Sequence, residues 1–243
     1  MNRIETIVTD CVNWIRKYFE ETGGKKAVIG ISGGKDSTVA AALCVEALGT
    51  ENVIGVMMPN RYQSDIEDSC KIVEYLGIKW YSIDICAPFD DIINEIDRFT
   101  DLEISNQTKI NLAPRLRMAT LYAIAQSCNG RVCNTCNYSE DYVGYSTLYG
   151  DLAGDFSPLG KLFVSDIIKI GDFFGLPEEL VHKTPSDGLC GLTDEDNLGF
   201  TYDELERYIK GDKNCEHSEL IEKKINASRF KREMIKIPTF DNL

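Results

Sequence analysis

The sequence predicts an α/β fold, a doubly wound parallel sheet flanked by helices. Short apolar segments with the composition of buried strands recur along the first half of the chain, and a segment with helical periodicity lies between them. Strands that alternate with helices form parallel βαβ units. Because the chain has 243 residues, of which 43% are hydrophobic, it can bury one sizeable core. We therefore expect a single domain over residues 1–243.

The elements follow from periodicity and from the residues that end them. Residues 1–21 carry apolar side chains at helical spacing, and Gly23-Gly24 ends this predicted helix. Strands are expected at 26–31, 52–58, 79–85 and around Val132. Helices are expected at 38–48, 64–76, 89–98, 111–127, 165–174 and 202–208. The glycine-rich and aromatic segment from 140 to about 160 is typical of loops, and residues 184–200 indicate a mobile surface loop.

Charge and cysteine content narrow the class of protein. The net charge of −13 argues against a protein that grips a nucleic-acid backbone, because neutralising phosphates requires a basic face. No apolar run approaches the roughly 20 residues of a membrane span, and the first residues lack the apolar region of a secretory signal. Nine cysteines without an export signal favour reduced thiols. We therefore expect a cytoplasmic protein without a nucleic-acid or membrane partner.

A glycine-rich segment follows the first predicted strand and opens the next helix. Adjacent glycines allow backbone N–H groups to approach phosphate oxygens, and the helix N-terminus adds free amides and a positive dipole. The spacing fits neither a Walker A loop nor a dinucleotide-binding loop. Asp36 implies a cation, because a carboxylate in a phosphate site is repulsive unless Mg²⁺ lies between them. The candidate ATP-binding residues are Gly30, Ile31, Ser32, Gly33, Gly34, Lys35, Asp36 and Ser37.

The motif Ser-Gly-Gly-x-Asp-Ser at 32–37 resembles the signature of the ATP pyrophosphatase (PP-loop) family. This resemblance implies the adenine nucleotide alpha hydrolase-like fold. It also implies that a substrate oxygen attacks the α-phosphorus of ATP and releases pyrophosphate. The six residues indicate this reaction class but not the substrate.

Further motifs resemble the ammonia-dependent NAD synthetases over about residues 10–240. They are the segment Asn111–Met118, with Arg115 and Arg117 behind a first-turn Pro114, and the segments 135–159 and 183–205. The resemblance implies an ATP-dependent amidation of deamido-NAD (nicotinic acid adenine dinucleotide) that yields NAD, AMP and pyrophosphate through an adenylated carboxylate. It implies ATP contacts for Arg117, Thr135 and Ser186, and Mg²⁺ ligation by Asp36 and Glu140. For deamido-NAD it implies Arg115, Asp155, Phe230 and Lys231.

The resemblance also implies the nitrogen donor and a homodimer. Glutamine-dependent members carry an additional amidase domain, for which this chain has no room, so we expect free ammonia. Asp151 is a catalytic candidate that would bind the incoming ammonium and help to deprotonate it, and Asp36 is the other catalytic candidate. The chain departs from the family at Leu148 and Val164, where lysines are common. Lys161 is near enough in sequence to replace the lysine missing at Val164.

Two alternatives stay open from the sequence. Cys133 and Cys136 form a Cys-x-x-Cys pair, and tRNA-modifying enzymes of the thiolase type combine such a pair with the same phosphate loop. Two cysteines supply half of the ligands that a structural metal site needs, so we expect no metal there. The second alternative is a nucleotide-binding paralogue with impaired catalysis, suggested by Leu148 and Val164. The acids at 90–103 and 194–206 are expected on solvated helix faces.

Overall fold

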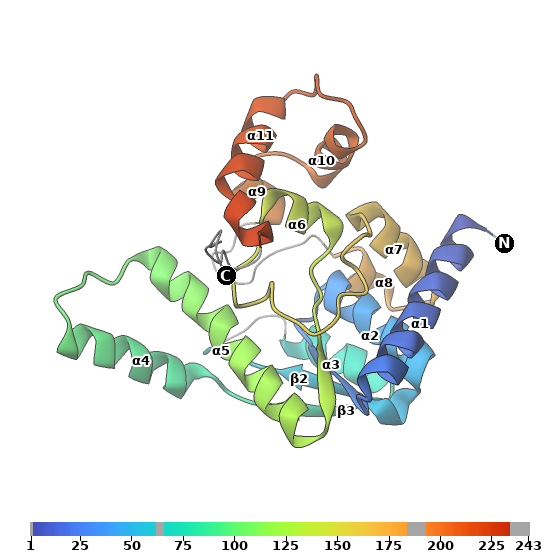
Figure 1. Ribbon diagram of the computed structural model, residues 1–243, viewed down its shortest axis with the longest axis horizontal. Coiled ribbons are helices and arrows are strands. Elements are labelled where there is room, and N and C mark those ends of the chain that lie inside the picture. The colour runs from blue at the N-terminus through green and yellow to red at the C-terminus, as the bar shows by residue number, and fades with distance from the viewer. Residues whose placement is uncertain (1, 62–65, 184–192, 234–243) are drawn as a thin grey trace, which may run out of the picture.

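The computed structural model describes residues 2–61, 66–183 and 193–233. Its centre is a four-stranded parallel sheet in the order β3-β2-β1-β4 (Figure 1). In register, Val28 of β1 lies beside Ile54 of β2 and Val132 of β4. The parallel sheet confirms the fold class predicted from the sequence. The strands are β1 (Lys26–Gly30), β2 (Val53–Met57), β3 (Lys79–Ser82) and β4 (Gly130–Cys133).

Helices cover both faces of the sheet, and alternate residues of β1 face them. Ala27 and Ile29 join one apolar cluster, whereas Val28 joins another. This alternation is the two-residue period of a strand buried on both faces. The helices that contribute to the first cluster are α1 (Arg3–Thr22), α2 (Lys35–Leu48), α3 (Ile66–Tyr75), α7 (Val164–Phe173) and α8 (Glu178–Val181). The second cluster is covered by α5 (Asn106–Ser127).

A smaller group of helices packs above the end of the sheet where the strands terminate (Figure 1). Its apolar centre includes Val143, Leu198, Leu205 and Ile221, all buried. These residues come from different elements, so burial of one shared cluster holds the group together. Its elements are α6 (Tyr138–Val143), α9 (Asp194–Leu198), α10 (Tyr202–Ile209), α11 (Ser218–Ala227) and the 3₁₀ helix Arg229–Arg232. A further 3₁₀ turn, Thr50–Asn52, precedes β2.

The helix that carries the two arginines is longer than predicted. It begins at Asn106 rather than at Asn111, because the side chain of Ser105 accepts a hydrogen bond from the Thr108 amide and caps it. The expected first-turn position of Pro114 is therefore wrong, and the proline lies inside the helix. Its ring removes one intrahelical hydrogen bond, which the many other bonds of this helix tolerate.

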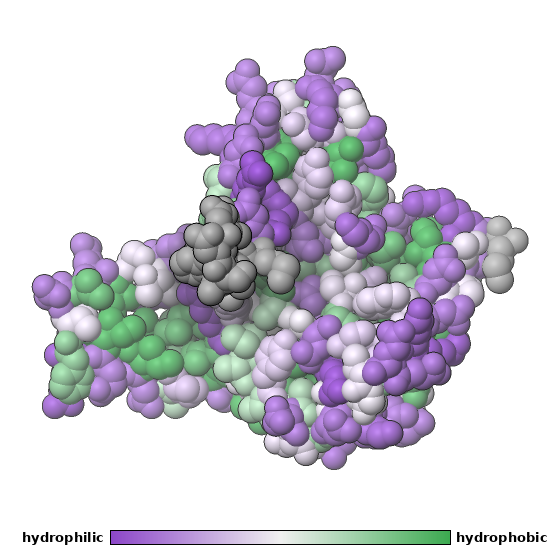
Figure 2. All heavy atoms as spheres, in the orientation of Figure 1, coloured by the Kyte–Doolittle hydropathy of each residue, from purple (hydrophilic) through white to green (hydrophobic). Residues whose placement is uncertain are grey.

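An arm extends from the sheet, made of α4 (Cys86–Phe99), the connection to α5 and the first part of α5 (Figure 1). No residue of α4 is buried. Phe99 and Leu102 are 68% and 66% exposed, and Figure 2 shows apolar side chains gathered over this arm. The edge of the sheet formed by β3 is also uncovered, since every residue of this strand is exposed.

Two short helices lie in segments that the sequence indicated as loops. The segment after β4 contains α6, and the expected loop 184–200 contains α9; residues 184–192 of that loop lie outside the described residues. Each helix begins with a reciprocal capping box, formed by Asn137 with Glu140 and by Thr193 with Asp196. Helices this short have too few residues to show a periodic pattern. No helix in the described part of the chain is both long and apolar enough to cross a membrane.

Candidate functional site

A cavity of about 740 Å³ lies where the ends of β1 and β4 meet α5 and the C-terminal helices. This is the edge of an open parallel sheet at which ligands of such folds bind. The structure brings most of the predicted site residues to this cavity. Those that line it are Gly30, Ile31, Ser32, Gly34, Lys35, Asp36, Ser37, Arg117, Thr135, Glu140, Asp151 and Lys231.

The phosphate loop is closed by its own serines. The hydroxyl oxygens of Ser32 and Ser37 lie 3.1 Å apart, and the Ser37 hydroxyl donates to the Gly34 carbonyl over 3.1 Å. Gly33 has a φ of 81°, which only glycine adopts without strain. Gly34 then caps α2, so the positive end of a 14-residue helix faces the cavity. The loop can therefore hold an anion such as a nucleotide phosphate.

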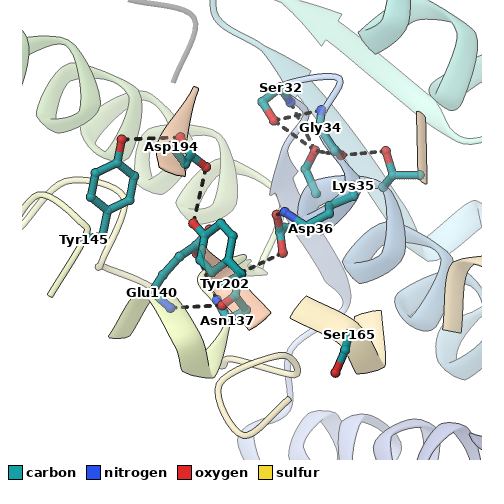
Figure 3. A network of polar contacts seen from close by, with 12 residues as sticks. Ser32, Gly34, Lys35, Asp36, Asn137, Glu140, Tyr145, Ser165, Asp194 and Tyr202 are labelled. Atoms are coloured by element: carbon teal, nitrogen blue, oxygen red, sulfur yellow. Dashed lines mark hydrogen bonds and ion pairs between the residues drawn. The ribbon is translucent and has the colours of Figure 1, made fainter. Parts of the chain in front are cut away.

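Two carboxylates from distant segments meet beside this loop. The side chain of Asn137 donates from Nδ2 to Oδ1 of Asp36 over 3.0 Å. The same asparagine caps α6: Oδ1 accepts from the Glu140 amide at 3.0 Å, and Oε2 of Glu140 accepts from the Asn137 amide at 3.1 Å. Burial, and then the charge of Asp36, raises the pKa of Glu140 well above its ordinary value. Figure 3 shows Asp36, Asn137 and Glu140 together at the loop.

This carboxylate pair fits Mg²⁺. Oxygen donors are what Mg²⁺ requires, and proteins usually bind it through one or two carboxylates plus the substrate's phosphates. A cation beside both carboxylates would offset the burial and the repulsion by Asp36 that raise the pKa of Glu140. Within the residues described, no group of three or more histidine, cysteine or acidic side chains could hold a metal by itself. The two carboxylates and a bound triphosphate together would provide the ligands.

A third acidic residue, Asp194, reaches the cavity from α9. It is 7% exposed, and its carboxylate accepts from the Tyr145 hydroxyl at 3.3 Å and from the Tyr202 hydroxyl at 3.4 Å. The expectation of solvated acids at 194–206 is therefore wrong for Asp194, and also for Glu204 and Glu206, which are 6% and 5% exposed. Sequence reasoning missed Asp194 because its neighbours Glu195 and Asp196 give the segment an ordinary acidic helix start.

Asp151 also lines the cavity. Its Oδ1 accepts from the Thr147 amide over 2.8 Å, which fixes the carboxylate inside its own turn. The cavity keeps the residue open to solvent, yet the surrounding protein atoms raise the pKa of its carboxyl. Thr147 in turn donates from its hydroxyl to Asn111 at 3.2 Å and ties the turn to α5. Asp151 is thus placed to accept a proton from a ligand in the cavity.

Two cationic side chains of the cavity lining come from different elements, Arg117 from α5 and Lys231 from the 3₁₀ helix Arg229–Arg232. The half-buried side chain of Arg117 donates from Nε to the Met58 carbonyl over 3.1 Å, and burial lowers its pKa. The ammonium of Lys231 donates to the carbonyls of Gly144 and Ser146 over 2.8 and 2.6 Å. Burial likewise lowers the pKa of Lys231. Both groups are positioned by backbone oxygens, so their charge remains directed at the cavity.

Three residues predicted to bind deamido-NAD lie outside the cavity lining. Arg115 is exposed and donates from Nε to the Leu148 carbonyl at 3.2 Å. Asp155 accepts from the Val132 amide at 2.7 Å and from the Tyr122 hydroxyl at 3.2 Å, next to β4. Phe230 is 59% exposed. Gly33 shapes the phosphate loop without lining the cavity, and Ser186 lies outside the described residues.

Lys161 is not in the position that a phosphate contact would need. Its ammonium lies 5.3 Å from the centre of the Tyr138 ring, on an exposed surface and outside the cavity lining. Val164, where the family has lysine, is 6% exposed and packs in the core of the C-terminal helices. The replacement of the missing lysine by Lys161 stays a prediction without a contact to support it.

Both cysteines of the Cys-x-x-Cys pair are buried. Cys133 and Cys136 are 3% and 5% exposed, and burial raises the pKa of both thiols well above the usual value. The Cys136 thiol donates to the Asp151 carbonyl at 3.3 Å, whereas Cys133 interacts with Cys44 of α2. A thiol held in its neutral form is a poor metal ligand and a poor nucleophile.

Comparisons with known proteins agree with this geometry. The family model described as NAD synthase matches residues 7–238. The NH(3)-dependent NAD(+) synthetase of Finegoldia magna is 38% identical over 234 residues, which cover 96% of this chain and 95% of that protein. The structure of NMN synthetase from Francisella tularensis matches with a TM-score of 0.91 and 34% identity, covering 99% of this chain and all of that one. The NH3-dependent NAD synthetase from Campylobacter jejuni matches with a TM-score of 0.81 and 26% identity, over 98% of this chain and 100% of that one.

Proposed function

The chain belongs to the NAD synthase family, and from this premise we propose how its cavity carries out the amidation. It is a carbon–nitrogen ligase that uses ATP and ammonia to convert deamido-NAD into NAD, AMP and pyrophosphate. Family membership favours this reaction over the tRNA-modifying alternative. The observation that carries the proposal is the pairing of Asp36 and Glu140 beside the phosphate loop through one asparagine. We also propose that residues 1–243 form one domain, because the family match spans most of the chain.

The first step joins the carboxylate of the substrate to ATP. A carboxylate oxygen attacks the α-phosphorus, the bond to the β-phosphate oxygen breaks, and pyrophosphate leaves. The phosphate loop holds the departing phosphates with backbone amides and with the hydroxyls of Ser32 and Ser37. When bound to Asp36 and Glu140, Mg²⁺ would neutralise charge on the pyrophosphate. Arg117 of α5 adds a half-buried positive charge to the cavity lining.

The second step forms the amide. Ammonia attacks the carbonyl carbon of the mixed anhydride, the bond to the AMP oxygen breaks, and one proton is released. Asp151 is the residue that would hold the incoming ammonium and take up its proton, because its carboxylate lines the cavity and its raised pKa favours proton uptake.

The similarity to the Francisella tularensis protein favours a second candidate substrate, the mononucleotide that becomes NMN. The amidated carboxylate belongs to the nicotinate ring in both substrates, so the chemistry is the same. They differ in the AMP half, which only the dinucleotide carries. Three residues predicted to hold the dinucleotide, Arg115, Asp155 and Phe230, lie outside the cavity lining. This placement agrees with a site that requires only the shared nicotinate half.

We further propose a homodimer built on the arm. Large side chains of α4, β3 and the connection to α5 are exposed without cover from the described chain, and Figure 2 shows the apolar ones of the arm gathered on one face. Exposed apolar patches of this kind mark protein–protein interfaces. A second copy offers the same patch, so a two-fold interface would cover both. The large exposed residues are Trp80, Tyr81, Ile83, Ile92, Phe99 and Leu102.

The test is pyrophosphate release measured with each substrate in turn. Purified protein with ATP, Mg²⁺ and ammonium should release pyrophosphate with deamido-NAD and form one NAD for each pyrophosphate. Glutamine in place of ammonium should give essentially no product. The ratio of kcat/KM for deamido-NAD and for the mononucleotide decides between the two substrates. Absence of release with both would contradict the proposed function.

A further inference from the structure

Lys35 is a buried lysine inside the phosphate loop. Its side chain is 3% exposed, and its ammonium lies 2.9 Å from Oδ2 of Asp36. Lys35 is one of the predicted ATP-binding residues of this loop, but an ATP contact alone does not explain why its ammonium is paired with a carboxylate. Burying a lysine costs free energy unless its charge is compensated. The ion pair with Asp36 therefore indicates a specific role.

The ammonium of Lys35 contacts Asp36, and Asn137 and Tyr202 connect this pair to two further carboxylates, Glu140 and Asp194. We call Asp36 of α2, Glu140 of α6 and Asp194 of α9 the carboxylate cluster. Burial by itself would lower the pKa of Lys35, but the charges of these three carboxylates outweigh it and raise that pKa above its usual value. The Tyr202 ring lies 5.7 Å from the ammonium, and its hydroxyl donates to Asp194. Figure 3 shows Lys35 and Asp36 between the loop and these C-terminal residues.

The carboxylate cluster needs positive charge before any nucleotide binds. Like charges that share a buried site repel one another, and one of them then takes up a proton or moves away. A single ammonium inside the cluster reduces this repulsion. It also opposes the entry of a free dication, because two positive charges then share the same carboxylates. A triphosphate would reverse that balance, since it brings negative charge together with the metal.

We propose that Lys35 is a built-in counter-cation of the carboxylate cluster, which stabilises the cluster without metal and makes Mg²⁺ enter together with ATP. This inference rests on the proposed role of Asp36 and Glu140 as metal ligands. Lys35 occupies the variable position of the Ser-Gly-Gly-x-Asp-Ser loop, and the inference gives this position a role in the order in which metal and nucleotide bind. Lys35 is thus a positioning residue, because it acts on the carboxylates that would hold the metal.

The test compares Lys35→Met with the unaltered protein in the absence of nucleotide. Free Mn²⁺, measured by electron paramagnetic resonance, serves as the probe for the Mg²⁺ site. We expect Lys35→Met to bind Mn²⁺ at least about tenfold more tightly, because the competing charge is gone. In EDTA the variant should unfold at a lower temperature, and Mn²⁺ should restore much of the loss. Lys213→Met, which removes a lysine stacked on Tyr208 outside the cavity, should change neither property.

A charge-balanced variant keeps the test decisive if Lys35→Met folds poorly. Lys35→Met/Asp194→Asn removes one positive and one negative charge, so it should be more stable in EDTA than Lys35→Met. Equal stability of these two variants, or equal Mn²⁺ affinity of Lys35→Met and the unaltered protein, would overturn the inference. The same titration with a non-hydrolysable ATP analogue tests the metal site itself. Failure of the unaltered protein to bind Mn²⁺ even then would count against Asp36 and Glu140 as ligands, not against Lys35 alone.

Discussion

Asn137 donates a 3.0 Å hydrogen bond to Asp36, although the two residues are 101 positions apart in the sequence. Asn137 is completely buried and also caps α6, so the helix that carries Glu140 and the loop that carries Asp36 share one anchor. The amide fits both tasks because its oxygen accepts from the Glu140 amide while its nitrogen donates to a carboxylate. Its position fixes the relation of the two predicted Mg²⁺ ligands.

The first prediction separates these two tasks of Asn137. Asn137→Ala removes the cap and the donor, and it should cost about 1 kcal/mol of unfolding free energy for the cap alone. Asn137→Ser retains an acceptor for the cap but loses the donor to Asp36. Both variants should lose activity about 10- to 100-fold, because residues that orient metal ligands have effects of this size. The serine variant should be the more stable of the two in urea unfolding.

A cap outside the site provides the control. Thr201 caps α10 through the Glu204 amide without contacting the carboxylate pair. Thr201→Ala should therefore lose a similar free energy of unfolding and keep its Mg²⁺ dependence. If Asn137→Ser showed normal activity and normal Mg²⁺ dependence, the bond to Asp36 would have no functional role.

The second prediction concerns the metal ligand itself. Asp36→Asn should abolish turnover while the protein stays folded, because an amide is a poorer Mg²⁺ ligand than a carboxylate. The same substitution also removes the carboxylate with which Lys35 forms an ion pair. Circular dichroism establishes that the variant is folded, and pyrophosphate release measures its turnover. Near-normal activity of this variant at limiting Mg²⁺ would exclude Asp36 as a ligand.

The third prediction uses Asp141, a half-buried acid that carries no proposed function. Burial raises the pKa of Asp141 to about 6 from its ordinary 3.8, and within the described chain its buried Oδ1 lacks a hydrogen-bond partner. The folded state then binds more protons than the unfolded state between these two pH values. This carboxyl therefore lowers the stability of the protein as the pH rises from about 4 to about 6.

Asp141→Asn removes that pH dependence. Its unfolding free energy, measured in urea, should exceed that of the unaltered protein above pH 6, and the difference should shrink towards pH 4. Asp196→Asn is the control of opposite sign, because the Thr193 cap lowers the pKa of Asp196. Stability from Asp196 is present above its ordinary pKa and is lost at lower pH. A pH-independent effect of Asp141→Asn would show that its pKa is not raised.

The sequence was sufficient for the sheet and the phosphate loop, because both are encoded locally. The apolar strands and the Gly33-Gly34 turn are continuous segments whose patterns depend only on neighbouring residues. Asp36 could be assigned from its place in the phosphate loop, but Glu140 could be assigned only through the family resemblance, since no local pattern places it beside Asp36. Asp194 was missed for the same reason: its burial depends on Tyr145 and Tyr202 from other segments. The start of α5 was missed because the Ser105 cap precedes a stretch without apolar periodicity.

The fourth prediction tests the homodimer. Phe99→Glu should shift the protein towards monomer in light scattering, because the ring is 68% exposed on the arm and a charge there would oppose burial in an interface. Phe173→Glu, on α7 and 47% exposed, changes a similar residue away from the arm and should leave the oligomeric state unchanged. A protein that is monomeric without any substitution would exclude the proposed interface.

The fifth prediction concerns Cys133 and Cys136, for which the metal and the incidental interpretations differ most. Cys133→Ala/Cys136→Ser should keep most activity, and the unaltered protein should purify without stoichiometric zinc or iron. The serine can still donate to the Asp151 carbonyl, as the thiol does at 3.3 Å. The alanine removes one heavy atom beside Cys44, which should lower the free energy of unfolding by about 1 kcal/mol, as for other small deletions in a core.

Both thiols have a raised pKa, and thiolates beside a bound triphosphate would add unfavourable negative charge. Native protein should therefore react slowly with a thiol reagent at these two cysteines, and quickly only after unfolding. Elemental analysis of the purified protein measures the metal content directly. Stoichiometric zinc or iron that disappears in the double variant together with activity would contradict this interpretation. It would make the cysteine pair part of the reaction rather than part of the core.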